Sequence, residues 1–534
     1  MSSPRPRLKA AFAAVTALGV ATALAACGGV DSGSGQSSPP AAGQTSHGPT
    51  QGDKLTLTVS APATGINPMT VNTAFVSYAL AAYEPLVYYG PGGKYEPALA
   101  AEWEVEPGNT AISLTLRDDA NFSDGTPVTA EAVKASLEYC ASDQSRNALA
   151  LADLEEIEVT GEHSLTLRLS QPYPLIMSLV SQQRACGMIV SPKGLEDIEN
   201  LTVDQPSAGA GRYVYDPAQS ISGDTYTYTA NPGYYDPSKQ YFKSLVIKVI
   251  AESQSSLNAL VTGQVDVANG DISTAQQAAG EPDIEMVWVP VVWAGLNLID
   301  RQGELTPAMG DVRVRQAINY AIDRAAIAQA ILGEFGVPTS SPSAEGYDGY
   351  TAEALNYYAY DPDKARQLLA EAGYPDGFEL PVATVAWGGL DTLTTAITPM
   401  LAAVGIQLQV TTTTDEKAYV EAATDRRHSA VAVGYGSLPM FRMGTDLVLP
   451  EARPFKGFGT DDPAALALLA ELRVATDDEQ LAKAQALNDY LVENAWFAPV
   501  LFTPIMYYFR PGITGLDVSG GRSTVSILDL RLAD

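Results

Sequence analysis

The sequence lacks the short motifs of the common hydrolases and nucleotide-binding enzymes. It has no Gly-x-Ser-x-Gly nucleophile elbow, no His-Glu-x-x-His metal motif and no Gly-x-Gly-x-x-Gly dinucleotide fingerprint. Gly93-Lys94 is not part of a P-loop, because Tyr88 stands where the first glycine belongs and Tyr95 where Ser or Thr belongs. Carboxylates are numerous, yet no pair stands out as a general acid and base. The sequence therefore predicts no enzyme.

Histidine and cysteine are scarce, with three of each in 534 residues. None of them has the spacing of metal ligands, so we expect neither a metal site nor a cofactor. Cys140 and Cys186 form an even pair, which in an oxidising compartment favours a disulfide. Closing that loop stabilises a protein by roughly 4 kcal/mol in the chain-entropy treatment. Two separate buried thiols are the alternative.

Positive charge is also scarce. The chain has 32 Lys and Arg against 62 Asp and Glu, a formal net charge of −30. Such a surface is unsuited to nucleic acid or to an anionic bilayer. We prefer solubility as the reason for the acidity over recognition of a cationic ligand.

Only the N-terminus has a long hydrophobic run. After three basic residues, an uncharged stretch at 10–23 leads to Leu24-Ala25-Ala26-Cys27-Gly28, which is similar to a bacterial lipoprotein signal. Cys27 would be the first mature residue and carry acyl chains, and removal of the three basic residues would change the charge from −30 to −33. The mature chain would be anchored at the extracytoplasmic face of the bacterial cell membrane. An ordinary signal peptide or an uncleaved anchor is the alternative.

The mature chain divides into a tether and a long body. Residues 27–52 are mostly Gly, Ser, Gln, Pro, Thr and Ala, which predicts a flexible linker after a signal peptide at 1–26. The body is long enough for two or three domains. It begins with an alternation of Leu55, Leu57 and Val59, which predicts a half-buried strand.

Several segments alternate strand and helix as a parallel sheet requires. We expect a strand at 380–386, a helix at 391–404 and a second strand at 406–410. The buried side of that second strand is predicted to be Ile406, Leu408 and Val410. Another helix is predicted at 361–373, since Asp-Pro begins it and Gly ends it. The apolar periodicity from 311 to 332 predicts one long helix.

A set of segments follows one order along the body. They are Ile66-Asn67-Pro68, Tyr83–Val87, Pro97–Val105, Leu114–Lys134, Gly209–Tyr213, Asn231–Tyr235, Ala259–Asp266 and Asp311–Arg324. The most specific, Leu114–Lys134, predicts a strand, a Ser-Asp-Gly-Thr-Pro turn and a helix capped by Thr129. Together the segments resemble the solute-binding proteins of ABC importers, specifically the dipeptide/oligopeptide-binding type, family 5.

This resemblance implies an α/β fold of the two-lobed periplasmic-binding-protein type II, with a hinge and an additional inserted domain. Lobe I would be discontinuous, with the second lobe and the inserted domain between its parts. The implied bounds are 53–86, 206–297 and 499–534 for lobe I, 87–205 for the inserted domain and 298–498 for lobe II. Both Cys140 and Cys186 fall in the inserted domain.

The resemblance also implies how the chain works. The lobes would close over a peptide or peptide-like solute, and a membrane permease would recognise the closed form. ATP hydrolysis would belong to partner ATPase subunits, so the chain itself would not be an enzyme. We expect a monomer that needs no cofactor and binds no nucleic acid.

Ligands of open α/β folds lie at the carboxyl ends of strands. Trp387 follows the predicted strand at 380–386, and Tyr435 follows a short predicted strand at 430–433; each either stacks on a ligand or fills the core. Trp293 matches the family's cleft-facing crossing strand, with the same two alternatives. The candidate ligand contacts are Asn67, Trp293, Trp387, Tyr435, Ser437, Leu438, Met440 and Arg442.

Leu438 bears on the kind of ligand. In peptide-binding members, the resemblance implies that an Asp at this position accepts the peptide's amino group. A leucine leaves a buried ammonium without a partner, which argues against the standard dipeptide mode. Asp446 is a candidate substitute and Arg442 a candidate anion ligand, although solvation is the more common role of such residues.

Other functions stay open at this level. The same fold would serve an oligosaccharide, favoured by a neutral aromatic cleft, or a metal chelate, favoured by an arginine pair. A sensor or adhesion lipoprotein would use the same closure to signal. An extracellular hydrolase is the enzyme alternative, and product formation from a trapped ligand would support it.

Overall fold

The computed structural model describes residues 52–72, 76–198, 201, 205–449, 462–518 and 525–533. The chain divides into two units after residue 47, and the first unit lies wholly outside the described residues. The predicted signal peptide, Cys27 and all of the predicted linker except Gly52 also lie outside the described residues. No helix in the described part of the second unit has both the length and the apolar character that crossing a membrane demands.

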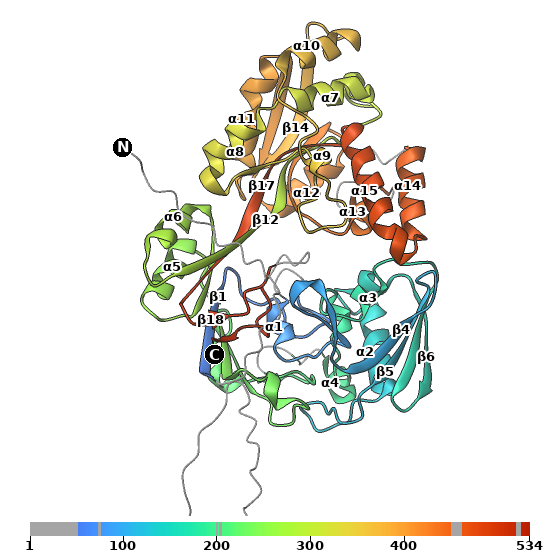
Figure 1. Ribbon diagram of the computed structural model, residues 1–534, viewed down its shortest axis with the longest axis vertical. Helices are drawn as coiled ribbons and strands as arrows, with labels where there is room; N and C mark the ends of the chain where they lie inside the picture. The colour runs from blue at the N-terminus through green and yellow to red at the C-terminus, as the bar shows by residue number, and fades with distance from the viewer. Residues whose placement is uncertain are drawn as a thin grey trace, which may run out of the picture. The chain divides into compact units, whose positions relative to one another are not determined.

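Eleven described strands join in one mixed sheet (Figure 1). Ten of them pair in the order β15 (Ile406–Thr413), β14 (Phe378–Val385), β16 (Ala430–Gly436), β12 (Glu285–Asn297), β17 (Phe497–Phe509), β11 (Val267–Gly270), β1 (Gly52–Val59), β10 (Phe242–Val249), β9 (Thr225–Ala230) and β8 (Tyr213–Tyr215). The eleventh, β13 (Val337–Pro338), pairs with β17. Strands β14, β15 and β16 are parallel to one another, as are β1, β10 and β11. In each half of the sheet, the carboxyl ends of the parallel strands therefore lie along one edge.

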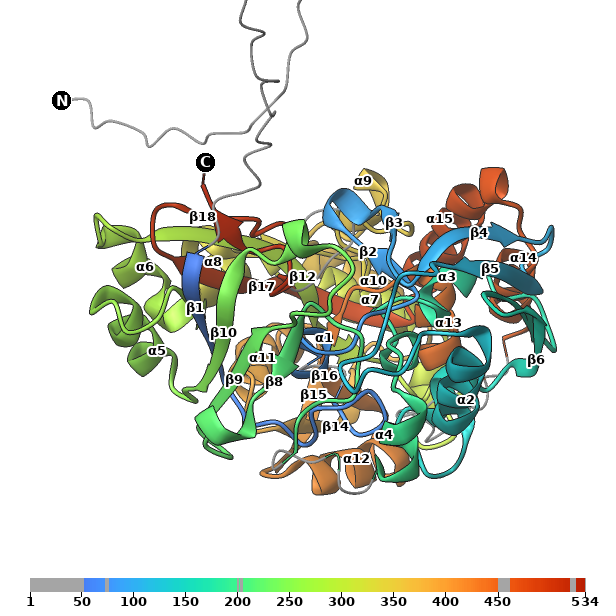
Figure 2. The same ribbon diagram turned by 90° about the horizontal axis from the view of Figure 1, so that it is seen from below.

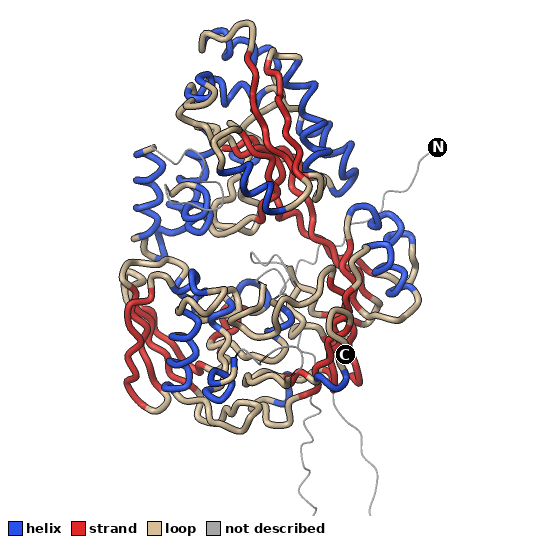
Figure 3. The backbone as a smooth tube through the Cα atoms, turned by 180° about the vertical axis from the view of Figure 1, so that it is seen from behind, coloured by secondary structure: helices blue, strands red, loops and turns tan. Residues whose placement is uncertain are grey.

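Among the described strands, β12 and β17 alone join the two halves, and from behind they run as a long pair between them (Figure 3). β16 pairs with β12 only from Val292 onward, and β11 pairs with β17 only from Met506 onward. Between these points Pro290 faces Pro504, and the register shifts before Val292. Proline has no N–H to donate. The sheet is therefore two strands wide and weakly hydrogen-bonded at this point, which suits a hinge.

The 298–498 segment surrounds its half of the sheet with helices. They are α7 (Val312–Tyr320), α8 (Arg324–Leu332), α9 (Ala352–Leu355), α10 (Pro362–Glu371), α11 (Leu390–Ala402), α12 (Glu416–Thr424), α13 (Met440–Leu447), α14 (Pro463–Arg473) and α15 (Asp477–Glu493). The predicted strand–helix–strand unit is present as β14, α11 and β15. Asp361 caps α10 by accepting the Lys364 N–H at 2.8 Å, as predicted. Val410, however, is 42% exposed, because β15 is an edge strand.

The single long helix predicted at 311–332 is wrong. The structure has two helices there, α7 and α8, and Asp323 caps the second by accepting the Ala326 N–H at 3.0 Å. The apolar periodicity continues across the break because residues of both helices contribute to one core.

Polar residues of the same segment anchor strand β17. Asn319 donates its amide N–H to the Phe497 carbonyl at 3.0 Å, and Arg324 donates its Nε–H to the Pro499 carbonyl at 2.8 Å. Both side chains are buried. Asn319 and Arg324, in the Asp311–Arg324 segment, therefore stabilise the fold.

The 87–205 segment has its own antiparallel sheet of β4 (Ala100–Val105), β5 (Ala111–Leu116), β7 (Ser164–Leu169) and β6 (Leu154–Gly161). It also has the hairpin β2 (Val87–Tyr89) and β3 (Tyr95–Pro97), and helices α2 (Ala130–Ala141), α3 (Ile176–Leu179) and α4 (Pro192–Glu196). Thr129 caps α2 as predicted, accepting the Ala132 N–H. In this structure Cys140 of α2 is joined to Cys186 by a disulfide. Figure 2 shows this sheet and α2 on the opposite side from α5 (Ser253–Val261) and α6 (Ile272–Gly280).

Strand β1 is buried on both faces, whereas a half-buried strand was predicted. Thr56 and Thr58, on the face opposite Leu55 and Leu57, are at most 4% exposed. The Thr58 hydroxyl lies 2.6 Å from that of Ser256 in α5, so α5 covers the threonine face, while Leu55 and Leu57 contribute to the hydrophobic core on the other face. Apart from short 3-10 helices, the remaining described helices and strands are α1 (Ser77–Leu80), β18 (Ile513–Thr514) and β19 (Arg531–Leu532).

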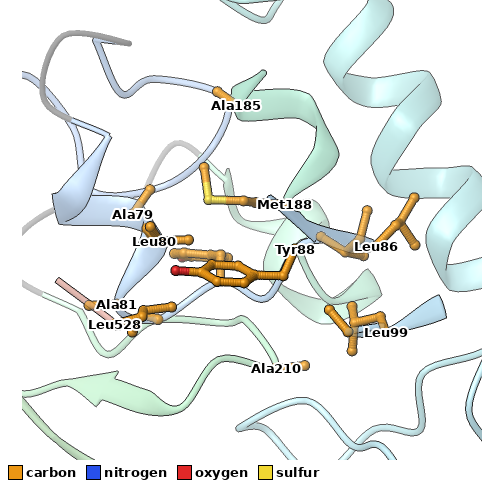
Figure 4. Close-up of a cluster of buried hydrophobic side chains, with 14 of the residues drawn as sticks. Ala79, Leu80, Ala81, Leu86, Tyr88, Leu99, Ala185, Met188, Ala210 and Leu528 are labelled. Atoms are coloured by element: carbon orange, nitrogen blue, oxygen red, sulfur yellow. The ribbon is translucent and has the colours of Figure 1, made fainter. Parts of the chain in front are cut away.

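One hydrophobic core continues from the first half of the large sheet into the 87–205 segment. Figure 4 shows Leu86, Tyr88, Leu99 and Met188 gathered in it with Leu528 of the C-terminal segment. The Tyr88 hydroxyl donates to Asp529 at 2.8 Å. Because this core is shared, the 87–205 segment and the first half of the large sheet pack as one body.

Several of the family-like segments meet around Glu84. Its Oε1 atom accepts the hydroxyls of Tyr234 and Tyr235 at 2.8 and 2.9 Å. The Arg117 guanidinium lies 3.4 Å above the Tyr235 ring. These three family-like segments therefore contact one another inside the fold.

Candidate ligand-binding site

The carboxyl ends of β14 and β16 form one half of the candidate site. The two strands are parallel, so the loop after Val385 and the loop after Gly436 leave the same edge of the sheet. Trp387 lies in the first loop and is 49% exposed, with its ring edge-on to Tyr419 at 6.1 Å. Leu438, in the second loop, is half-buried. Both side chains remain predicted ligand contacts.

Two other predicted contacts lie inside the protein. Asn67 is buried; its amide donates to the Leu201 carbonyl at 3.0 Å and its Oδ1 accepts the Met69 N–H at 3.0 Å. Trp293 is fully buried and packs against Phe497 at 5.3 Å. The scaffold encloses both side chains in this structure, and their ligand role stays a prediction.

Ser437 and Met440 are also buried and held by contacts within the protein. The Ser437 hydroxyl donates to the Pro342 carbonyl at 3.2 Å and accepts the Ala344 N–H at 3.1 Å. Met440 is fully buried, and its main-chain N–H donates to Asp348 at 2.8 Å. Burial raises the pKa of Asp348, and the hydrogen bond from Met440 opposes that shift. Both residues therefore shape the loop after β16 and do not line its surface.

Tyr435 and Arg442 meet at Asp446. The Asp446 Oδ2 atom accepts the Tyr435 hydroxyl at 2.8 Å and the Arg442 Nε–H at 2.7 Å. Burial raises the pKa of Tyr435 well above its ordinary value, and the Asp446 charge adds to the rise. Asp446 is therefore already neutralised by Arg442. This pairing makes Asp446 a poor acceptor for a ligand ammonium. The sequence had left open that Asp446 takes this role in place of an aspartate at position 438.

The 87–205 segment meets α13 and α14 beside this cluster. The Tyr173 ring packs edge-on against Phe441 at 5.5 Å, and Tyr173 contacts the cores of both halves. Arg184 donates to the Tyr173 hydroxyl at 3.0 Å. Arg473 donates to the Pro172 carbonyl at 3.4 Å. The candidate site is thus bounded by both halves of the molecule.

Sequence reasoning missed Tyr173, Arg184, Phe441 and Arg473. The two prolines that flank Tyr173 were the only local signal, and they indicate an extended turn without indicating what it faces. The contact partner lies far away in the sequence, so no periodicity links the two segments.

Two hollows lie in the first half of the large sheet. A cavity of about 70 Å³ lies at the carboxyl ends of β1 and β11, lined by Val59, Tyr78 and Asn269 among others. A hollow of about 660 Å³ lies at the amino end of β1, beside Asp53, Asp266 and other charged residues. The smaller one fits the rule that ligands bind at carboxyl ends. Among the described residues, no group of three or more His, Cys, Asp or Glu is arranged to hold a metal ion.

The sequence profile described as "Bacterial extracellular solute-binding proteins, family 5 Middle" matches residues 94–442, more than half of the chain. The chain belongs to this family. The predicted family is therefore confirmed, and the family is one of solute-binding proteins rather than enzymes.

Individual relatives agree with this assignment. The "Probable D,D-dipeptide-binding periplasmic protein DdpA" of Escherichia coli (strain K12) is 28% identical over 329 residues, which cover 59% of this chain and 61% of the relative. The "Glutathione-binding protein GsiB" of Escherichia coli O1:K1 / APEC is 27% identical over 377 residues, covering 67% and 69%. The family 5 chain thus spans about three fifths of the first relative's length.

Solved structures show the same fold. The PBP AgaA, in complex with agropinic acid, from A. tumefacien R10 superposes with a TM-score of 0.73 at 24% identity, covering 90% of this chain and 99% of that one. The predicted fold class is confirmed: the chain has the two-lobed α/β fold of periplasmic binding proteins, with a hinge and an additional domain.

Proposed function

We propose that this chain is the lipid-anchored, extracellular solute-binding component of an ABC importer. It captures a peptide or peptide-like solute and delivers it to a membrane permease, while partner ATPase subunits hydrolyse ATP. The observation that carries the proposal is the narrow point of the sheet at Pro290 and Pro504, which we call the waist. There β12 and β17 are the described strands that join the two halves, and loops at the carboxyl ends of strands lie on either side, in a chain of this family. The dipeptide- and glutathione-binding names of its relatives support a peptide-like solute.

The proposed domain division follows the waist. Lobe I comprises 53–86, 206–297 and 499–534, the inserted domain 87–205 and lobe II 298–498. Rotation at the waist lets lobe II close onto the rest, because few hydrogen bonds oppose bending there. A solute shifts this equilibrium only by its difference in affinity for the open and closed forms. The chain works as a monomer and needs no cofactor.

Solute binding is expected to compact the protein. We expect the radius of gyration of the purified chain, measured by small-angle X-ray scattering, to fall when an equimolar tripeptide mixture is added. A parallel titration with maltooligosaccharides tests the alternative solute class. Closure with the sugars alone would replace the peptide assignment, and unchanged scattering with both would contradict the proposed trap.

The proposed anchor at Cys27 has a test of its own. Cys27→Ser is expected to move the protein from the membrane fraction to the soluble fraction, since two or three acyl chains provide the attachment. The intact mass of the native protein should include those chains. Ser32→Ala, in the same linker, is the matched control and should remain in the membrane fraction. A Cys27→Ser protein that stays with membranes although its mass shows that residues 1–26 have been removed would contradict the lipid anchor.

A further inference from the structure

A segment distant in the sequence supports the loop that follows β16. This loop, 437–440, contains the predicted ligand contact Leu438. The supporting segment is 339–351, which we call the strap; it runs from the end of β13 to the start of α9 and contains no helix or strand. Glu345 and Gly346 are its only exposed residues. Most loops lie on the surface, so a segment buried over this length indicates a structural role.

The sheet and the strap together hold the first residue of the loop. Ser437 donates its main-chain N–H to the Val291 carbonyl of β12 at 2.6 Å. Its hydroxyl donates to the Pro342 carbonyl at 3.2 Å and accepts the Ala344 N–H at 3.1 Å, and both of these residues belong to the strap. Because Ser437 is buried, water does not compete for these hydrogen bonds. The loop therefore begins at a fixed point.

Asp348 of the strap holds the last residue of the loop. Its Oδ1 atom accepts the Met440 N–H at 2.8 Å, across 92 residues of sequence. Met440 is the first residue of α13, and Pro439 at the N-cap position provides no side-chain hydrogen bond to the helix. The first N–H groups of a helix need acceptors, and a carboxylate is a favourable one. Asp348 therefore caps α13 in place of a neighbouring residue.

The strap also packs against the Met440 side chain without a gap. A methyl group added at Gly349 would lie 2.3 Å from the Met440 Cγ atom and 2.6 Å from its Sδ atom. The same methyl group would lie 3.0 Å from the Ser343 hydroxyl. Met440 is fully buried, so it has no free space into which to move. Strap and loop are therefore fitted to each other at this point.

These contacts leave Leu438 between two anchored residues. Leu438 is half-buried, whereas Ser437 and Met440 are buried. Pro439 follows it with φ at −49°, and the proline ring restricts that angle. The backbone around Leu438 therefore has little freedom, and the strap determines where this side chain lies beside the carboxyl ends of β14 and β16.

We propose that Asp348 is a positioning residue of the solute site: by accepting the Met440 N–H, it holds the loop after β16 in the conformation that binds solute. The inference rests on the proposed function and adds a residue that is not itself a predicted ligand contact. A loop without this hydrogen bond would have to be ordered when solute binds, and that ordering lowers affinity.

Two substitutions separate the hydrogen bond from the charge. Asp348→Ala removes the acceptor, whereas Asp348→Asn keeps an oxygen in the same place. Burial raises the pKa of Asp348 and so disfavours its charge, which makes the neutral amide a suitable replacement. Gly349→Ala is an independent variant, because it displaces Met440 and leaves Asp348 in place.

Hydrogen exchange of the ligand-free full chain, followed by mass spectrometry, measures the loop directly. We expect amides of 437–447 to exchange about tenfold faster in Asp348→Ala, and faster also in Gly349→Ala. Asp348→Asn should exchange as the wild type. Asp361→Ala is the matched control, because Asp361 is a carboxylate that accepts the Lys364 N–H of α10 at the same distance, 2.8 Å. It should accelerate exchange at the start of α10 and leave 437–447 unchanged.

Native mass spectrometry with an equimolar tripeptide mixture then measures binding. We expect Asp348→Ala to bind about tenfold more weakly than the wild type. Asp348→Asn and Asp361→Ala should bind as the wild type. Loss of a helix cap is common to Asp348→Ala and Asp361→Ala, so a general loss of stability would affect both variants and a positioning role only the first.

Three results would overturn the inference and leave the proposed function standing. They are unchanged exchange of 437–447 in Asp348→Ala, faster exchange without weaker binding, and an Asp348→Asn protein as impaired as Asp348→Ala. Failure of the mixture to bind the wild-type protein would instead refute the peptide function, and the inference with it.

Discussion

Replacing Arg324 with methionine is expected to lower the free energy of unfolding by about 3–5 kcal/mol. The Arg324 Nε–H donates to the carbonyls of Pro499 at 2.8 Å and Thr339 at 3.0 Å. Its Nη groups donate to the carbonyl and the side-chain oxygen of Asn319, at 2.8 and 2.6 Å. An Nη group also donates to the Tyr358 carbonyl at 3.3 Å, so one side chain satisfies five buried acceptors on four segments, including β17.

The size of the effect follows from burial. Burial lowers the pKa of Arg324 to about 10, so the group still holds its proton at neutral pH and donates all these bonds. Methionine matches much of the stem but leaves the carbonyls without donors, and each such group costs about 1–3 kcal/mol.

Urea unfolding followed by circular dichroism measures the change. Arg366→Met is the matched control, because Arg366 is a half-exposed arginine of the same lobe that pairs with Asp363 on the surface of α10. We expect it to cost less than about 1 kcal/mol. Equal shifts for both variants would show that the buried carbonyl contacts contribute little.

Removing the disulfide is the second change with a large expected effect. The double variant Cys140→Ser with Cys186→Ser should lose about 4 kcal/mol, since the crosslink spans 46 residues and restricts the unfolded chain. Both cysteines are fully buried in the core that the 87–205 segment shares with lobe I. We therefore expect the transition of that whole body to move to lower temperature.

Differential scanning calorimetry of the variant, compared with wild-type protein before and after reduction, tests this expectation. Reduced wild type should unfold near the variant's temperature, and oxidised wild type well above it. The intact mass should rise by two hydrogens on reduction. Thiol labelling of denatured but unreduced protein would show instead that Cys140 and Cys186 are separate thiols.

Local patterns predicted local structure well. Asp361 and Thr129 begin their helices as expected, because a cap depends only on residues three positions away. The family was identified from ordered segments whose polar groups, such as Glu84 and Arg324, hold the fold together. By contrast, the break at Asp323 was missed, since the apolar spacing on both sides suits one continuous helix.

The sequence by itself determined the family, the fold class and the elements whose signals lie within a few residues. Tertiary structure alone decided that β15 is an edge strand and that Trp293 is core. It also placed Tyr173 of the 87–205 segment against Phe441, and it paired Asp446 with Arg442. The physical reason is that exposure, ion pairing and cleft position depend on contacts between segments distant in the chain, which no local spacing encodes.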